Sequence, residues 1–98
     1  MPSYMLFIRE GEVLDPAAMA AYQAHNRATP PSNGIKPLVV YGKLEALEGE
    51  APDGVVLLEF PDSASARAWY ESPEYQAGVP FRQKAAPYRA ILMEGWAR

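Results

Sequence analysis

The sequence contains a single histidine, His25. Histidine is the side chain whose ordinary pKa, about 6.5, suits proton transfer at neutral pH. His25 stands near the end of a helix-forming segment, where a positive charge also suits the helix dipole. Tyr22 precedes it by three residues, but no orienting partner is evident along the chain. Two readings stay open: a general base, or an ordinary histidine at the end of a helix.

Glu59 is the second candidate for acid–base chemistry. It follows the apolar run of residues 55–58 and points to the same strand face as Val55 and Leu57. If a dimer buries that face, the loss of water would tune this carboxyl group to act as an acid or base. The alternative is a place at the rim of the sheet. There its ion-pair partner would be one of the arginines Arg9, Arg82 and Arg89.

Aromatic side chains form a third group, and they indicate binding of a small molecule. A flat or apolar ligand packs against aromatic rings, while tyrosine hydroxyl groups fix its orientation. An arginine adds a planar guanidinium group that can hold a ligand carboxylate. Helical spacing equally allows Tyr22 and Trp69 to belong to the core. The candidate ligand-binding residues are Tyr22, Tyr41, Trp69, Tyr70, Tyr75 and Arg82, with Phe81 as a further aromatic.

The sequence does not contain the residue patterns that are typical of metal, thiol, phosphate or dinucleotide sites. One histidine with scattered carboxylates does not give the paired spacing of a metal site, so we expect no metal and no cofactor. The absence of cysteine excludes disulfides, thiolate catalysis and cysteine metal ligands. The sequence has no glycine-rich phosphate loop and no dinucleotide fingerprint. Ser72 is better explained as a helix cap than as a nucleophile.

Length and composition set the class of protein. The 98 residues suit a single domain over residues 1–98, and 49% hydrophobic with 21% charged residues is a globular profile. The net charge is −3, whereas proteins that bind nucleic acid usually carry an excess of basic residues, so we expect no nucleic-acid partner. No apolar run approaches the roughly 20 residues that cross a membrane. The apolar start has no basic residues before it, so we expect no secretory signal and a cytoplasmic location.

The elements that must position these residues follow from the apolar pattern. It predicts strands over residues 4–8, 35–41, 55–60 and 88–94. Asp15 and Asp62 each precede a helix-forming segment and accept bonds from its first turn. The first helix must end by Thr29, before two prolines. A short extra helical segment is expected from Pro73 to about residue 84. Pro37 cannot donate to a ladder, which favours an edge strand or a bulge.

The predicted order is strand, helix, strand, strand, helix, strand. This βαββαβ order is that of a ferredoxin-like fold, an α+β architecture with a four-stranded antiparallel sheet and helices on one face. The two halves of the sequence share a weak internal repeat, in which an aromatic residue follows an acidic helix cap at the same spacing. Asp15 and Tyr22 are seven residues apart, as are Asp62 and Trp69.

The strands are apolar on both faces, although helices cover only one face of such a sheet. Leu6 and Ile8 oppose Met5 and Phe7 on the first strand, and the third and fourth strands behave likewise. Each large apolar side chain gains about 1.5–3 kcal/mol on full burial, so an exposed face of this kind usually marks an interface. The simplest cover is a second copy packed sheet on sheet. We therefore expect a homodimer through the sheet faces.

One stretch carries a family resemblance. Residues 59–76, EFPDSASARAWYESPEYQ, resemble the signature of the bacterial family of domain of unknown function 1330. Asp15-Pro16 followed by Tyr22, and Gly42 after the second strand, also fit. The resemblance implies a ferredoxin-like chain that pairs into a dimeric α+β barrel, and it implies no particular activity. The wider group of dimeric α+β barrels includes antibiotic-biosynthesis monooxygenases, haem-degrading enzymes, and isomerases or decarboxylases of small ring compounds.

Three functions fit these expectations. The first is binding of a small organic ligand, aromatic or carboxylate-bearing, in a cleft between sheet and helices. The second is a cofactor-independent enzyme of monooxygenase or isomerase type that uses Glu59 or His25 as its acid or base. The third is a structural or regulatory dimer with a filled core.

Overall fold

The strands and helices follow one another along the chain in the predicted order. The computed structural model describes residues 1–96, which form four strands and four helices. The strands are β1 (Ser3–Arg9), β2 (Lys36–Val40), β3 (Gly54–Phe60) and β4 (Tyr88–Glu94). The helices are α1 (Pro16–Ala28), α2 (Ser63–Tyr70), α3 (Pro73–Gln76) and α4 (Val79–Ala85). The expected extra helical segment is thus present as α3 and α4, which are separated by Ala77 and Gly78.

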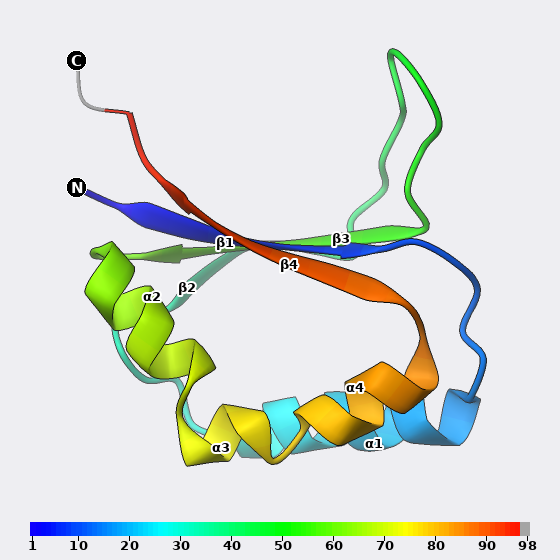
Figure 1. The fold of residues 1–98 in the computed structure, drawn as a ribbon, viewed down its shortest axis with the longest axis horizontal. Helices are drawn as coiled ribbons and strands as arrows, with labels where there is room; N and C mark the ends of the chain where they lie inside the picture. The colour runs from blue at the N-terminus through cyan, green and yellow to red at the C-terminus, as the bar shows by residue number, and fades with distance from the viewer. Residues whose placement is uncertain (97–98) are drawn as a thin grey trace.

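The strands form one antiparallel sheet in the order β2-β3-β1-β4. This confirms the ferredoxin-like α+β fold, with β3 and β1 in the centre. β2 is an edge strand, and its register shifts between Pro37 and Val39. Both features follow from a proline that has no N–H to donate. All the helices lie on the same side of the sheet, as Figure 1 shows.

The two long helices begin where their aspartate caps predict. The Asp15 carboxylate accepts a hydrogen bond from the Ala18 amide at 3.0 Å, and Asp62 accepts one from the Ser65 amide at 2.7 Å. Thr29 closes α1 with an extended backbone, directly before the proline pair. These local signals therefore position α1 and α2 against the sheet.

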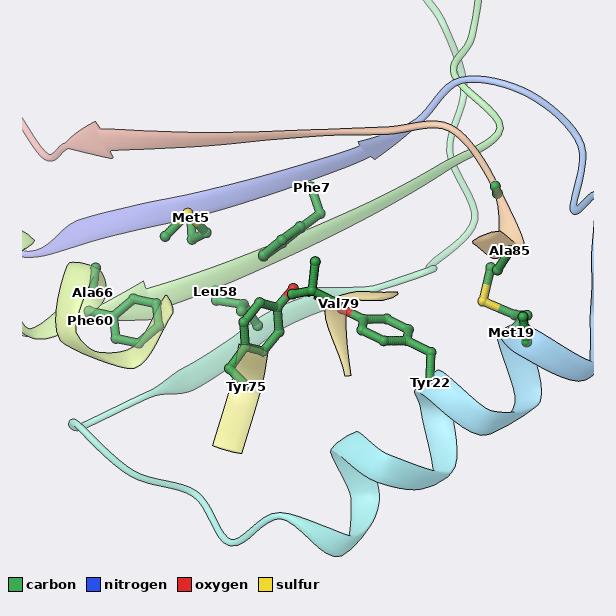
Figure 2. Close-up of a cluster of buried hydrophobic side chains, with 12 residues drawn as sticks. Met5, Phe7, Met19, Tyr22, Leu58, Phe60, Ala66, Tyr75, Val79 and Ala85 are labelled. Carbon is green, nitrogen blue, oxygen red and sulfur yellow. Dashed lines mark hydrogen bonds between the residues drawn. The ribbon is translucent and has the colours of Figure 1, made fainter. Parts of the chain in front are cut away.

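The core lies between the helices and one face of the sheet, here called the inner face. The sheet contributes Met5 and Phe7 from β1, together with Leu58 and Phe60 from β3. The helices add Met19, Tyr22, Ala66, Tyr75 and Val79, which Figure 2 shows pointing toward the strands. Phe60 is the most deeply buried large side chain of this cluster.

The opposite surface of the sheet, here called the open face, has no helix over it (Figure 1). Its central row runs across all the strands through Val39, Leu57, Leu6 and Ile91, which are register partners. The connection over residues 42–53 extends away from the helices, on the side of the open face. Among residues 1–96, no helix has the length and apolar character needed to span a membrane.

Candidate functional site

A cleft of about 510 Å³ lies between the inner face, α1, and the junction of α2 with α3. The sheet contributes Phe7, Val56 and Leu58 to its apolar wall. α1 contributes Tyr22 and, nearer the solvent, Asn26. Ligand cavities for small organic molecules commonly measure about 300–1,000 Å³, so this cleft has a suitable size.

Two of the aromatic side chains that line the cleft come from the two helices that begin with an aspartate cap. Tyr22 stands seven residues after Asp15 on α1, and Trp69 stands seven residues after Asp62 on α2. Both side chains line the cleft. The weak internal repeat of the two halves therefore corresponds to two aromatic rings that face one space.

Tyr22 and Tyr75 form the first of two tyrosine pairs in the cleft. Their hydroxyl oxygens are 3.0 Å apart, and Figure 2 shows the two rings reaching toward each other from α1 and α3. Burial raises the pKa of Tyr75, and the neighbouring Tyr22 hydroxyl raises it further. The Tyr75 hydroxyl can therefore serve a ligand as a neutral donor or acceptor.

Tyr41 and Tyr88 form the second pair, and their hydroxyl groups are hydrogen-bonded although they come from opposite edges of the sheet. Tyr41 follows β2 with a φ of 52°, a left-handed conformation that is rare for a side-chain-bearing residue. Its ring passes so close to Gly54 that a Cβ there would lie 2.9 Å from Tyr41 Cδ1. Such an outlier beside a cleft is a mark of functional sites. Burial also raises the pKa of Tyr41.

Two arginines adjoin the second pair. The Arg82 guanidinium carbon lies 5.7 Å from the Tyr88 ring centroid and 5.5 Å from that of Phe7. The Arg9 guanidinium carbon lies 6.0 Å from the centroid of Tyr41. Arg82 is only 6% exposed. Within residues 1–96, its Nε and Nη1 atoms and the Nε atom of Arg9 are buried without a hydrogen-bond partner.

The structure brings together four of the residues that the sequence marked for ligand binding. Tyr22, Tyr41, Trp69 and Tyr75 all line the cleft. Tyr70 does not line it and stands beside Tyr75, with ring centroids 5.4 Å apart. Arg82 lies next to the lining rings of Phe7 and Tyr88 rather than at the cleft surface.

His25 lies outside the cleft, in a contact between helices. Its Nε2 atom donates a hydrogen bond to the main-chain carbonyl of Glu74, because a carbonyl oxygen can only accept. Its ring also packs so closely on Gly78 that a Cβ there would lie 2.8 Å from His25 Cδ2. This geometry fastens α1 to the α3–α4 segment.

Glu59 also lies outside the cleft, on the open face. It accepts a hydrogen bond from the Tyr4 hydroxyl at 3.3 Å, across the β1–β3 ladder. The expected arginine partners do not pair with it among the described residues. His25 and Glu59 are therefore on different sides of the sheet and share no site.

Sequence reasoning did not assign Tyr88 or Phe7 to the site. Both lie on helix-facing positions of their strands, where an apolar pattern predicts core packing alone. It also assigned no site residue to the segment after α1, where Thr29 and residues 30–32 line the cleft. The one sequence signal for Tyr88 is that it points to the same face of the last strand as Leu92, four residues later.

Within residues 1–96, no cluster of three or more histidine and carboxylate side chains is suited to a metal ion.

Comparison with solved structures supports the fold. A protein of unknown function from Rhodopseudomonas palustris is 24% identical, with a TM-score of 0.67 over 99% of this chain and 84% of that chain. A dimeric ferredoxin-like protein of unknown function from Bacteroides fragilis is 15% identical, with a TM-score of 0.64 over 96% of each chain. A dimeric ferredoxin-like protein of unknown function from Thermobifida fusca is 14% identical, with a TM-score of 0.59 over 95% of this chain and 90% of that chain.

The family assignment comes from a separate comparison. None of the curated proteins matches the chain. The model of one protein family does match, over residues 3–96, and this range includes every strand and helix described above. The family is a domain of unknown function, DUF1330. The chain belongs to the DUF1330 family.

Proposed function

We propose that the protein binds a small organic ligand, aromatic or carboxylate-bearing, in the cleft beneath the sheet. The observation that carries this proposal is the pairing of apolar walls with two tyrosine hydroxyl pairs in one space of about 510 Å³. Phe7 and Trp69 offer ring faces for packing, and the hydroxyl groups orient polar atoms of the ligand.

The enzyme alternative gains no support from the two residues that suggested it. His25 donates to a main-chain carbonyl, and Glu59 lies on the other side of the sheet. Tyr75 and Tyr41 keep their protons because burial raises the pKa of each. The cleft therefore favours recognition by neutral hydrogen-bonding groups over proton abstraction by either predicted base.

We also propose that two chains pair through their open faces. The apolar row through Leu57 and Leu6 leaves half-buried and exposed side chains on one continuous surface. Two of the similar solved structures are described as dimeric. The cytoplasmic location, and the absence of nucleic-acid partners, stay predictions from the sequence.

The ligand proposal is tested by filling the cleft. Val40 is 60% exposed and lines the cleft from the edge strand, so Val40→Trp should fill the space without disturbing the core. Leu14→Trp adds the same ring at a position that is 74% exposed and outside the cleft. Binding of indole, phenylacetamide and phenylacetate is followed by saturation-transfer NMR.

We expect at least one of these probes to bind the wild-type chain and the Leu14→Trp variant, and to lose about tenfold or more in affinity for Val40→Trp. Native mass spectrometry of protein purified without added ligand reports any retained molecule and the subunit number together. The proposal fails if none of the probes binds, or if filling the cleft leaves their affinities unchanged.

A further inference from the structure

We propose that the end of the cleft lined by the Tyr41–Tyr88 pair, whose rings Arg9 and Arg82 adjoin, holds the carboxylate group of an aromatic acid. This inference rests on the proposed function and adds the chemical class of the ligand and the orientation in which it binds. The ring of the acid packs between the aromatic walls nearer the cleft mouth.

The first argument is the unbalanced positive charge. Arginine stays charged in proteins, and a buried charge without a partner is costly. Arg82 is 6% exposed, and Arg9 is half-buried. The ion pairs found within residues 1–96 join Lys84 to Asp15 and Arg89 to Glu10, so neither Arg9 nor Arg82 has a carboxylate partner in the described chain. A bound anion would supply the missing charge.

The second argument is that hydrogen bonds within the chain compensate these two charges only in part. Arg82 Nε, Arg82 Nη1 and Arg9 Nε are buried donors that lack partners within residues 1–96. Arg9 does use its Nη2 atom, which donates to the Asp53 main-chain carbonyl at 2.9 Å. The Asp53 carboxylate instead accepts from the Gly11 amide. The Asp53 carboxylate forms no ion pair with Arg9 in the described chain, although the main-chain carbonyl of Asp53 accepts from that arginine.

The third argument is a spare proton on the tyrosine pair. Two phenols carry two protons, and the bond between Tyr41 and Tyr88 uses only one of them. The nearest further acceptor is the thioether sulfur of Met19, 3.9 Å from the Tyr88 hydroxyl, and thioether sulfur is a weak acceptor. A carboxylate oxygen is a far stronger acceptor for that proton, and hydrogen bonds to charged groups are about twice as strong as neutral ones.

Neither Arg9 nor Arg82 lines the cleft, so the carboxylate would contact the tyrosine hydroxyl groups, and the two guanidinium groups would attract it through their charge. Arg82 lies against the ring of Tyr88 and Arg9 lies near the ring of Tyr41, each within about 6 Å of the ring centroid. The protein between each guanidinium group and the hydroxyl end of the ring has a lower effective dielectric constant than water, so these charges favour an anion there. At the mouth of the cleft, Arg27 and Glu74 are both exposed and carry opposite charges, so they give no competing preference for an anion.

The test compares an acid with its amide. Phenylacetate and phenylacetamide have nearly the same shape, and only the first is charged at neutral pH. Their affinities are measured by calorimetry on the wild-type chain and on the variants Arg82→Gln, Tyr88→Phe and Arg67→Gln. Arg67 is exposed on α2 and outside the cleft, so Arg67→Gln makes the same charge change as Arg82→Gln at a remote place.

We expect the wild-type chain and Arg67→Gln to bind phenylacetate about tenfold or more tightly than phenylacetamide, which is the size of one charge-assisted hydrogen bond. Arg82→Gln and Tyr88→Phe should lose that preference and keep the affinity for the amide. Added salt should weaken binding of the acid alone. The salt series uses the wild-type chain, so it still tests the inference if either variant fails to fold.

The outcomes separate the inference from the proposal beneath it. If the amide binds as well as the acid, the anion site is wrong and ligand binding in the cleft stands. If the acid is preferred equally by wild type and a folded Arg82→Gln variant, the assignment of the charge to this end of the cleft is wrong. If neither probe nor indole binds, the proposed function fails as well.

Discussion

A phenol that is buried keeps its proton, because the phenolate form loses its hydration. Tyr75 is 4% exposed, and both it and Tyr41 have a pKa above the ordinary value of 10.0. The hydroxyl group of the partner tyrosine raises the pKa further, Tyr88 for Tyr41 and Tyr22 for Tyr75. At the scale of single residues, Tyr41 and Tyr75 are therefore neutral donors and acceptors, which suits selection of a ligand.

The raised pKa of Tyr75 and of Tyr41 predicts that alkaline pH destabilises the protein. An unfolded tyrosine ionises near pH 10, whereas these two remain protonated in the folded chain to higher pH. The unfolded chain then binds fewer protons, and the free energy of unfolding falls as pH rises, by up to about 1.4 kcal/mol per pH unit for each phenol. Urea unfolding between about pH 9 and 11, at fixed protein concentration, measures this slope. Tyr75→Phe should make it shallower, and an unchanged slope would contradict the prediction.

At the scale of elements, the end of β2 and the start of β3 act together. Tyr41 takes a left-handed backbone conformation directly after β2, and its ring lies across Gly54, the first residue of β3. Any larger residue at that position would displace the ring. The missing side chain of Gly54 therefore lets Tyr41 reach Tyr88 beneath the central strands.

Gly54→Ala should lower the free energy of unfolding by about 1–3 kcal/mol, because the new methyl group overlaps the Tyr41 ring. In a Tyr41→Ala background the same substitution should cost far less, since the two sites are in contact. Gly42→Ala is the matched control, because its added Cβ would lie 3.7 Å from Val39, an ordinary contact. Urea denaturation of the four variants measures the effect. A Gly54→Ala chain as stable as wild type would refute the overlap, and an equal loss in both backgrounds would refute the role of Tyr41.

The elements themselves were predictable because their signals are local. Asp15 and Asp62 mark the helix starts, and Pro37 marks an edge strand with a bulge. The cleft was only partly predictable. Tyr22 and Trp69 stand out by their equal offsets from the caps, but Tyr88 acquires its role from a partner at the opposite edge of the sheet. Periodicity indicates which face a strand residue occupies and carries no information about such long-range contacts.

The same limit explains the two predicted bases. The strand pattern placed Glu59 on the face of Val55 and Leu57, and the structure has it there. The pattern did not say which face the helices would cover. Because the helices cover the face of Met5 and Phe7, Glu59 is separated from the cleft by the sheet itself.

At the scale of the whole molecule, the open face is the largest feature that the single chain leaves unexplained. Its central row is apolar from one edge of the sheet to the other, and Ile91 and Met93 on the edge strand β4 are exposed. The connection over residues 42–53 extends on the same side and carries Leu47, which is 86% exposed. A second chain packed on the open face would cover the apolar row and lie beside this connection.

Leu57→Lys should convert the proposed dimer into a monomer. Leu57 occupies the centre of the apolar row, between Val39 and Leu6, and its side chain points away from the core. A lysine there would have to lose its water inside the interface without a partner, which costs several kcal/mol, while a monomer would leave it solvated. Leu14→Lys, at a position 74% exposed on the helix side of the chain, should leave the dimer intact. Sedimentation equilibrium measures the mass of each variant, and circular dichroism confirms that each is folded. A wild-type chain that sediments as a monomer, or a Leu57→Lys chain that stays dimeric, would show that the open face has another role.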